Sequence, residues 1–370
     1  VAMIQHSQKP VFLVGGGVIL SETTKYLEDI VNTTKIPVVT TLMGKGAIPD
    51  SHELHLGMGG MHGSYASNKA ISGCDLLIAL GARFDERLTS RADTFAPNAQ
   101  IIHFEIDDVE IDKIIDIDLG IKGDLRWSLP IFAKKLKEGA FDYGAAFADW
   151  RHEVLAMKKS HPFATPPRPG CISPQSIFAA VRDITRDDDT VAITDVGQHQ
   201  MWAAQFFTTD EPKHFISSGG LGTMGFGLPA ALGAKVACPE KTVVVFSGDG
   251  SILMNGQEFA TLSEYGIDVK VIVLHNDTLG MIVQLQDFFY NHHYSQCTLN
   301  KRKNLPMLAE SLGVKGYAIE KQDDLIPVLK EAFAHKGPAL VDIRISPEER
   351  VYPTVPGGKA LSDMILGGDA

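Results

Sequence analysis

The stretch TVVVFSGDGSILMNGQEFATLSEYGIDVKVIVLHND, residues 242–277, decides the fold of the second half of the chain. An apolar strand ends in Gly248-Asp249-Gly250, a helical segment follows, and a second apolar strand ends in His275-Asn276-Asp277. This βαβ pattern predicts two neighbouring parallel strands, so Asp249 and Asn276 are expected at the same edge of a sheet.

The side chains at that edge predict a site for Mg²⁺ and a diphosphate. A carboxylate and an amide oxygen suit Mg²⁺, which takes few protein ligands and completes its shell with water and phosphate oxygens. Gly248 and Gly250 would let the backbone approach a diphosphate closely, and the helix after Gly250 would offer free N–H groups to it. The alternative is an acidic turn in an ordinary doubly wound sheet, because strand–turn–helix signals are common.

Composition and charge narrow the class of protein. The 370 residues predict two or three domains. The net charge of −11 argues against a nucleic-acid or anionic-membrane partner. Four cysteines without CxxC spacing argue against a zinc site or a disulfide framework and fit a reducing compartment. Apolar runs stay below the roughly 18 residues that a membrane-spanning helix needs.

The order of apolar segments predicts an α/β fold with two doubly wound parallel-sheet domains. Strands are expected at 11–14, 38–41, 76–80 and 101–106 in the first half, and at 190–194, 242–246, 269–275 and 339–345 in the second. The predicted domains are residues 1–140 and 174–370. A polar, proline-rich linker is expected at 141–173, and residues 350–370 are expected to form a lid or a loose terminus.

Polar and glycine residues follow the strands of the first half. They are Gly15-Gly16-Gly17, Arg83 and Asp85, Glu105 and Asp107, and Gly123-Asp124. An arginine can neutralise a phosphate, and an acidic residue at a strand end can hold a ribose. Each feature alone fits a surface turn or an ion pair. Together they favour a dinucleotide site, without distinguishing FAD from NAD.

Several segments, read together, resemble the catalytic large subunit of acetolactate synthase, also called acetohydroxyacid synthase. They stand in the order of that family and span nearly the whole chain: TTLMGKGAIP (40–49), GMHG (60–63), GARFDERLT (81–89), TDVGQHQMWAAQ (194–205), SGGLGTMGFGLPAA (218–231), the GDG stretch and VYPTVPGGKAL (351–361).

The resemblance implies a central FAD-binding domain followed by a C-terminal domain that binds the diphosphate of thiamine diphosphate (ThDP). It implies a decarboxylating condensation of two pyruvates to 2-acetolactate, or of pyruvate with 2-ketobutyrate, in branched-chain amino-acid biosynthesis. The family also has an N-terminal domain with a glutamate that activates ThDP. Because no segment here matches it, we expect a partial chain that is inactive alone.

The resemblance also implies the site residues. Asp249, Asn276 and the carbonyl of Thr278 would bind Mg²⁺. ThDP would contact Val196, Gly197, Gln198, His199, Gly222, Met224, Gly248, Gly250 and Ser251. FAD, as a structural cofactor, would contact Gly15, Gly16, Gly17, Thr41, Leu42, Met61, His62, Gly81, Ala82, Arg83, Asp85, Glu105, Ile106 and Asp124. Arg87 would grip the acceptor carboxylate, and Met281 and Leu285 would line the pocket.

Three positions depart from the family pattern. His275 stands where the family usually has the first of two asparagines, Val283 where it often has arginine, and Leu285 where it often has tryptophan. A leucine fills less of the acceptor pocket than tryptophan. We therefore expect a weaker preference for 2-ketobutyrate and resistance to sulfonylurea and imidazolinone herbicides.

By resemblance, the protein is expected to form a homodimer or homotetramer and to bind a small regulatory subunit, in the cytoplasm or, in a eukaryote, in a plastid or mitochondrion. Two other functions stay open. One is a different FAD- and ThDP-dependent enzyme such as pyruvate oxidase, in which the flavin accepts electrons. The other is a non-catalytic chain that only holds cofactors.

Overall fold

The computed structural model describes residues 1–165, 168–299 and 303–367. Pro166 and Pro167 of the predicted linker, and residues 368–370 of the predicted tail, lie outside the described residues. The chain divides into two compact units. Unit 1 comprises Val1–Phe163, Thr208–Lys213 and Tyr352–Ala370, and unit 2 comprises Ala164–Phe207 and His214–Val351.

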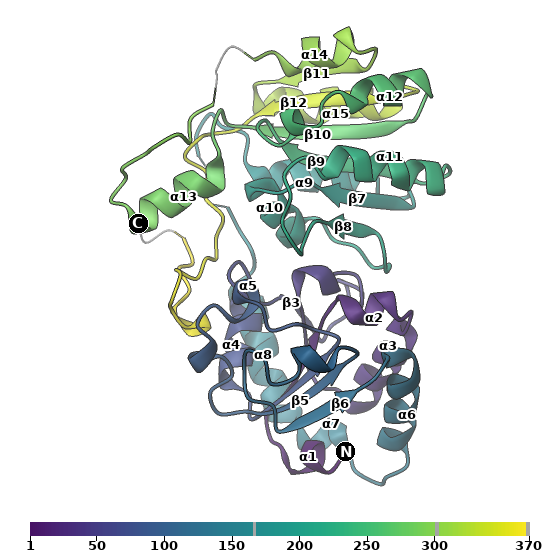
Figure 1. Cartoon of the computed structure of the whole chain (residues 1–370), viewed down its shortest axis with the longest axis vertical. Helices are drawn as coiled ribbons and strands as arrows, with labels where there is room; N and C mark the ends of the chain where they lie inside the picture. The colour runs from purple at the N-terminus through teal and green to yellow at the C-terminus, as the bar shows by residue number, and fades with distance from the viewer. Residues whose placement is uncertain (166–167, 300–302, 368–370) are drawn as a thin grey trace. The chain divides into compact units, whose positions relative to one another are not determined.

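In the described part of unit 1, six parallel strands form a sheet in the order β3-β2-β1-β4-β5-β6. Figure 1 labels β3, β5 and β6 of this sheet. The strands are β1 (Pro10–Val14), β2 (Val38–Thr40), β3 (His55–Met58), β4 (Leu76–Leu80), β5 (Gln100–Glu105) and β6 (Leu119–Lys122). The α-helices are α1 (Ala2–His6), α2 (Gly16–Leu20), α3 (Thr24–Thr34), α4 (Tyr65–Gly73), α5 (Glu86–Thr89), α6 (Leu125–Lys137), α7 (Tyr143–Ala146) and α8 (Ala148–Ser160). Short 3₁₀ turns are η1 (Leu42–Gly44), η2 (Ala92–Thr94), η3 (Asp108–Glu110) and η6 (Leu361–Asp363).

The central strands of unit 1 are apolar throughout because both faces of the sheet are covered. All five residues of β1 and all five of β4 are buried. Neighbouring residues of one strand enter different clusters: Phe12 and Ile78 pack in one core, and Val11 and Leu77 pack in the other. The side-chain period of two therefore builds two hydrophobic layers from one sheet.

The strand order of unit 1 reverses between β1 and β4. From β1 the chain moves outward to β2 and β3, and from β4 it moves the other way to β5 and β6. Ligands of open α/β sheets bind at the carboxyl ends of the strands beside such a reversal. Gly15 and Gly81 lie there, and a Cβ on Gly15 would approach the carbonyl oxygen of Gly81 to 2.1 Å, so only glycine fits at position 15.

In the described part of unit 2, a second sheet of six parallel strands has the order β11-β12-β10-β9-β7-β8. The strands are β7 (Thr190–Thr194), β8 (Phe215–Ser217), β9 (Thr242–Gly248), β10 (Val269–His275), β11 (Lys315–Ile319) and β12 (Ala339–Arg344). The helices are α9 (Pro174–Ile184), α10 (Gln198–Phe206), α11 (Gly227–Ala237), α12 (Glu258–Glu264), α13 (Gly280–Phe289), α14 (Leu305–Ser311) and α15 (Leu325–Ala334), with 3₁₀ turns η4 (Ile252–Met254) and η5 (Gln322–Asp324).

The sheet of unit 2 also has apolar residues on both faces. Val191, Val243 and Val271 contribute to the core on one face. On the other face the ring of Phe246 lies 4.6 Å from that of Phe178 and 5.5 Å from that of Phe207, between ring centroids. Here the strand order reverses between β7 and β9, which places the expected ligand position at the carboxyl ends of these two strands.

The predicted fold class is confirmed, because both sheets are all-parallel and helices follow the strands. The eight predicted strands are present. Strands β3, β6, β8 and β11 were not predicted as strands, since they are only three to five residues long and several of their residues are exposed or half-buried.

The predicted domain boundaries differ from the two units. Much of the predicted linker forms α7 and α8 of unit 1, where Trp150 is buried and its indole N–H donates to the carbonyl of Pro10 at 3.1 Å. Residues 352–367 of the predicted tail belong to unit 1 as well, since Val355 N–H donates to the carbonyl of Met61 at 2.8 Å and Leu361 packs in a core of unit 1. A helix long and apolar enough to cross a membrane is absent from the described residues.

Candidate functional site

The residues predicted to contact ThDP lie at the carboxyl ends of the strands of unit 2. Val196–His199 follow β7, Gly222 and Met224 follow β8, and Gly248–Ser251 end and follow β9. Ser251 Oγ donates to the carbonyl of Val196 at 2.9 Å, which ties the turn after β9 to the turn after β7. The structure therefore gathers these residues at the edge beside the reversal of strand order.

The three predicted metal ligands also come together there. Asn276 N–H donates to Asp249 Oδ1 at 3.4 Å, and Thr278 N–H donates to Asn276 Oδ1 at 3.1 Å. Asp249 and Asn276 are buried. A carboxylate, an amide carbonyl and a backbone carbonyl are all oxygen donors, so this set fits Mg²⁺. A cavity of ≈ 670 Å³ lies beside the turn that follows β10 and is lined in part by Asn276, Thr278 and Arg344.

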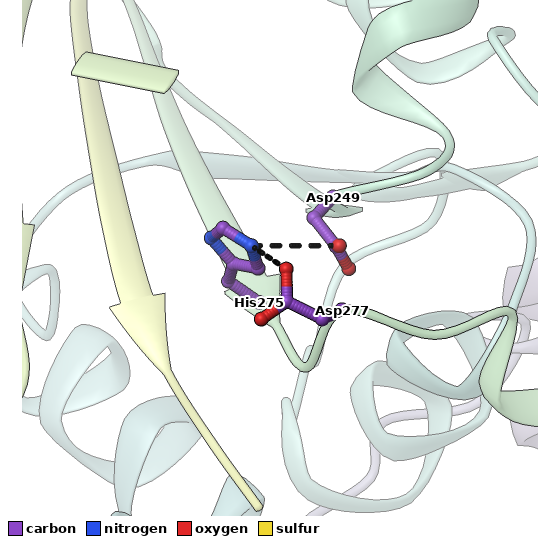
Figure 2. Close-up of side chains that lie close together, drawn as sticks. All are labelled: Asp249, His275 and Asp277. Atoms are coloured by element: carbon purple, nitrogen blue, oxygen red, sulfur yellow. Dashed lines mark hydrogen bonds and ion pairs between the residues drawn. The ribbon is translucent and has the colours of Figure 1, made fainter. Parts of the chain in front are cut away.

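A charged cluster surrounds Asp249, consisting of Asp249, His275, Asp277, Lys303 and Arg344. Figure 2 shows one ring nitrogen of His275 facing both carboxylates: Nε2 lies 3.0 Å from Asp277 Oδ1 and 3.5 Å from Asp249 Oδ2. One ligand atom from each of these three residues lies within 4.8 Å of the others. Lys303 Nζ contacts both carboxylates, and Arg344 Nη1 lies 2.7 Å from Asp277 Oδ2. Sequence reasoning missed this cluster, because Lys303 and Arg344 are distant along the chain.

The cluster shifts the pKa values of its members. Burial lowers the pKa of the His275 ring, but its hydrogen bond to Asp342, at 2.8 Å, and the charges of Asp342 and Asp249 outweigh burial and raise that pKa above 6.5. Burial raises the pKa of Asp277, but the hydrogen bonds from Lys303, Arg344 and His275 hold it well below its usual range. The cluster thus pairs carboxylates with cations.

His199 is buried against the GDG turn. Burial lowers the pKa of its ring to about 3, so the ring is neutral at physiological pH. A Cβ on Gly248 would approach His199 Nδ1 to 2.9 Å, so this glycine makes room for the imidazole. Among the described residues, His199 Nε2 is a buried polar atom without a hydrogen-bond partner, which fits a site that receives a polar ligand.

Gln198 makes buried contacts within unit 2. Its Nε2 donates to the carbonyl of Glu349 at 2.8 Å, and its Oε1 accepts from Asn276 Nδ2 at 3.3 Å. The predicted cofactor residue Gln198 therefore also orients the predicted metal ligand Asn276. The helix expected directly after Gly250 is instead the 3₁₀ turn η4, and α12 begins only at Glu258, so the expected helix N-terminus is not next to the GDG turn.

Asp195 is a site residue that sequence reasoning missed. Its Oδ1 accepts from the N–H groups of Val196 at 2.9 Å and Gly225 at 2.8 Å. Burial raises the pKa of this carboxyl. Asp195 thereby joins the turn after β7 to the turn that carries Met224. The signal was an aspartate directly after the strand at 190–194.

Helix α13 carries the two residues that were predicted to line the acceptor pocket. Met281 is half-buried, whereas Leu285 is 41% exposed. Between them Gln284 is buried, and its amide makes two hydrogen bonds with the backbone of Val351, at 2.9 and 3.1 Å. These bonds fix α13 to the last residue of unit 2.

The residues predicted to contact FAD lie at the carboxyl ends of all six described strands of unit 1. Gly15–Gly17 follow β1, Thr41 and Leu42 follow β2, and Met61 and His62 follow β3. Gly81, Ala82, Arg83 and Asp85 follow β4, Glu105 and Ile106 end and follow β5, and Asp124 follows β6. The structure therefore brings them to one edge of the sheet.

Three of these polar side chains cap helical turns. Thr41 Oγ1 accepts from Gly44 N–H, Asp85 Oδ1 from Arg87 N–H, and Asp124 Oδ1 from Arg126 N–H, at 2.8–3.1 Å. Arg83 is exposed, with Nη2 at 3.9 Å from Asp85 Oδ2. The capping role alone explains the residue type at these three positions.

The side chain of Glu105, which is predicted to contact FAD, makes local hydrogen bonds. Its Oε1 accepts from its neighbours, Ile106 N–H at 2.8 Å and Asp107 N–H at 3.2 Å, and the side chain is 9% exposed. The carboxylate therefore folds onto its own backbone. Ile106 is 64% exposed beside it, which leaves an apolar surface at this strand end.

Arg87 and the GMHG segment meet in unit 1. Met61 N–H donates to the carbonyl of Arg87 at 2.8 Å, and Arg87 Nη1 lies 3.6 Å from Met61 Sδ. His62 Nδ1 lies 3.3 Å from the carbonyl oxygen of Pro353. Burial lowers the pKa of His62 to about 4, so its ring is neutral at physiological pH. The guanidinium of Arg87 is exposed and can receive a carboxylate.

Comparisons with known proteins show which families this chain is similar to. Residues 1–131 match the family model of the thiamine pyrophosphate enzyme central domain, and residues 195–343 match that of the C-terminal TPP binding domain. The acetolactate synthase large subunit of Porphyra purpurea is 41% identical over 98% of this chain and 61% of its own length. That of Parasynechococcus marenigrum is 44% identical over 98% of this chain and 58% of its own length.

A third relative, the acetolactate synthase of Mycobacterium bovis, is 41% identical over 98% of this chain and 59% of its own length. The chain therefore spans 58–61% of the length of these curated relatives.

Proposed function

The chain belongs to the thiamine pyrophosphate enzymes, as a homologue of acetolactate synthase large subunits, and on this premise we propose that the protein containing it makes 2-acetolactate from pyruvate. We propose that it also condenses pyruvate with 2-ketobutyrate. One observation supports this proposal most strongly. Asp249, Asn276 and Thr278 lie together at the carboxyl edge of the sheet, in which the strand order reverses between β7 and β9.

In this proposal unit 2 holds ThDP through Mg²⁺. Asp249, Asn276 and the Thr278 carbonyl bind the metal, and the turns after β7 and β9 receive the diphosphate. ThDP supplies an electron sink that stabilises the carbanion formed on decarboxylation. Asp195 and Gln198 position the turns, and neutral His199 turns its unpartnered Nε2 to a polar group of the ligand.

Unit 1 holds FAD in the same proposal. The close approach of Gly15 and Gly81 leaves backbone rather than side chains at the reversal of strand order, which suits a dinucleotide. The exposed Arg83 guanidinium can pair with a phosphate of the dinucleotide. The Glu105 carboxylate bends back to its own backbone, and Ile106 and Asp107 are the exposed residues that follow it at that strand end.

We propose that Arg87 of unit 1 binds the carboxylate of the acceptor keto acid. Arg87 supplies an exposed guanidinium, which grips a carboxylate with two parallel hydrogen bonds. In unit 2, we propose separately that the apolar side chains of Met281 and Leu285 on α13 contact substrate. The relatives are named large subunits, and we accordingly propose a homodimer or homotetramer that binds a smaller regulatory subunit.

The test is formation of 2-acetolactate, followed by NMR, when the protein that contains this chain receives pyruvate, ThDP, Mg²⁺ and FAD. We expect 2-acetolactate to accumulate while the flavin absorbance stays that of the oxidised form. Pyruvate consumption with flavin reduction at the same rate would contradict the proposal and favour an oxidase. Absence of any product from pyruvate would contradict it as well.

A further inference from the structure

Lys303 is the member of the charged cluster that pairs with the proposed metal ligand. Its Nζ lies 2.8 Å from Asp249 Oδ2 and 2.9 Å from Asp277 Oδ1. The side chain of Asp249 is 2% exposed and that of Lys303 is 10% exposed. This is therefore a buried ion pair, in which the Lys303 ammonium group bridges two carboxylates.

The two other cations of the cluster contact different oxygens or lie further away. Arg344 Nη1 pairs with Asp277 Oδ2 at 2.7 Å, on the second carboxylate. His275 Nε2 lies 3.5 Å from Asp249 Oδ2, beyond the 2.8 Å of Lys303. The ammonium group of Lys303 is thus the cation that directly occupies the coordination position of Asp249 Oδ2.

We propose that Lys303 is an internal counter-cation of the metal site: its ammonium group holds Asp249 and must leave this carboxylate before a divalent cation binds there. The inference rests on the proposed function only in its use of Asp249 as a metal ligand. It assigns to Lys303 the role of disfavouring a metal ion that binds without a diphosphate, and none of the predicted site residues has that role.

The physical argument is electrostatic exclusion. A divalent ion bound to Asp249 Oδ2 would lie within a few Å of an ammonium group bound to the same oxygen, and like charges at that distance repel strongly in a buried site. A free ion must therefore displace Lys303 without compensation. An ion that arrives with a diphosphate brings negative charges that offset this repulsion, so Lys303 favours the metal–diphosphate pair over the metal alone.

The test is a titration with Mn²⁺ as the probe, in which electron paramagnetic resonance measures free Mn²⁺ in the absence of ThDP. We expect Lys303→Met to raise the Mn²⁺ affinity at least about tenfold, because a buried positive charge beside the ion is removed. The matched control is Arg344→Met, which removes one charge from the same cluster but leaves Asp249 paired. It should raise the affinity by less than about threefold.

Lys303→Arg is the second variant, because it keeps the charge and should keep the wild-type affinity. A Lys303→Met affinity equal to that of the wild type, or to that of Arg344→Met, would overturn the inference. Titrations with ThDP present separate it from the proposed function. If the wild-type protein binds Mn²⁺ with ThDP and Asp249→Asn does not, the metal site stands, and the inference is judged on Lys303 alone. If the wild-type protein binds no Mn²⁺ even with ThDP, both fail.

Discussion

At the residue scale, two glutamines of α13 make the same kind of contact in different surroundings. The Gln284 amide bonds to both backbone groups of Val351 in a buried position. The Gln286 amide bonds to both backbone groups of Ser295, at 3.1 and 3.2 Å, in an exposed position. The buried pair is the costlier one to remove, because water cannot replace its hydrogen bonds.

We expect Gln284→Ala to lower the free energy of unfolding by about 3 kcal/mol, since two buried backbone groups lose their partners. Gln286→Ala should cost less than about 1 kcal/mol, because water can bond to the groups it exposes. Urea unfolding of both variants measures the difference. Equal costs for the two substitutions would show that burial of the contact with Val351 is not what holds α13.

Site residues could be predicted from the sequence where the side chain suits one kind of ligand. The expectation of oxygen donors at Asp249 and Asn276 follows from strand ends and from the preference of Mg²⁺ for oxygen, whereas Thr278 was implied only by the family resemblance. Lys303 was not predictable, because it reaches Asp249 from a segment 54 positions away along the chain. The same holds for Asp342, which contacts His275 from a different strand.

At the element scale, buried strands were predictable and short edge strands were not. Strands β1, β4, β7 and β10 are apolar runs because both faces of each are covered. Strands β3 and β8 have four and three residues and too little periodicity to be recognised. Helix α8 was not predicted, because it lies before a proline-rich stretch and has few buried residues, among them Trp150 and Val154.

At the scale of the whole molecule, the division into two α/β sheets was predictable, but the path of the chain between them was not. Residues 208–213 and the segment after Tyr352 belong to unit 1 although they follow parts of unit 2. Side-chain contacts place these segments in unit 1. One example is the Asp50 carboxylate, which accepts from Thr209 N–H at 2.8 Å. Such contacts connect distant segments and leave no local pattern.

Buried histidines with lowered pKa values occur in both units, and unit 2 also contains buried carboxyls with raised pKa values. In unit 1, burial lowers the pKa of His52, of His62 (to about 4) and of His103. In unit 2, burial lowers the pKa of His199 to about 3 but raises the pKa values of Asp195 and Glu349.

Because the pKa values of these histidines are lower in the folded chain, the unfolded chain binds their protons at a higher pH than the folded chain does. The stability they contribute is full above the ordinary value of 6.5 and is lost as the pH falls towards the folded value. The raised pKa values of the carboxyls have the opposite effect on stability. The folded chain binds their protons at a higher pH than the unfolded chain does, so the folded state gains stability as the pH falls.

We therefore expect unit 1 to lose more stability than unit 2 between about pH 7.5 and about pH 5.5, with about 1 kcal/mol from His62 alone. Trp150 reports on unit 1 when Trp127 and Trp202 are replaced by Phe. Trp202 reports on unit 2 when Trp127 and Trp150 are replaced. Fluorescence-detected thermal unfolding of the two variants at both pH values measures the shift, and a larger loss in unit 2 would refute the expectation.

The central claim is that Asp249 binds the metal that holds ThDP, and its most direct test is calorimetric titration with ThDP in the presence and absence of Mg²⁺. The matched pair is Asp249→Asn, at the carboxyl end of β9, and Asp268→Asn, which precedes the amino end of β10 and pairs with Lys270 at 2.6 Å. The account predicts Mg²⁺-dependent ThDP binding that Asp249→Asn weakens by at least about a hundredfold and Asp268→Asn leaves unchanged. Equal ThDP affinity for Asp249→Asn and the wild-type protein would contradict it.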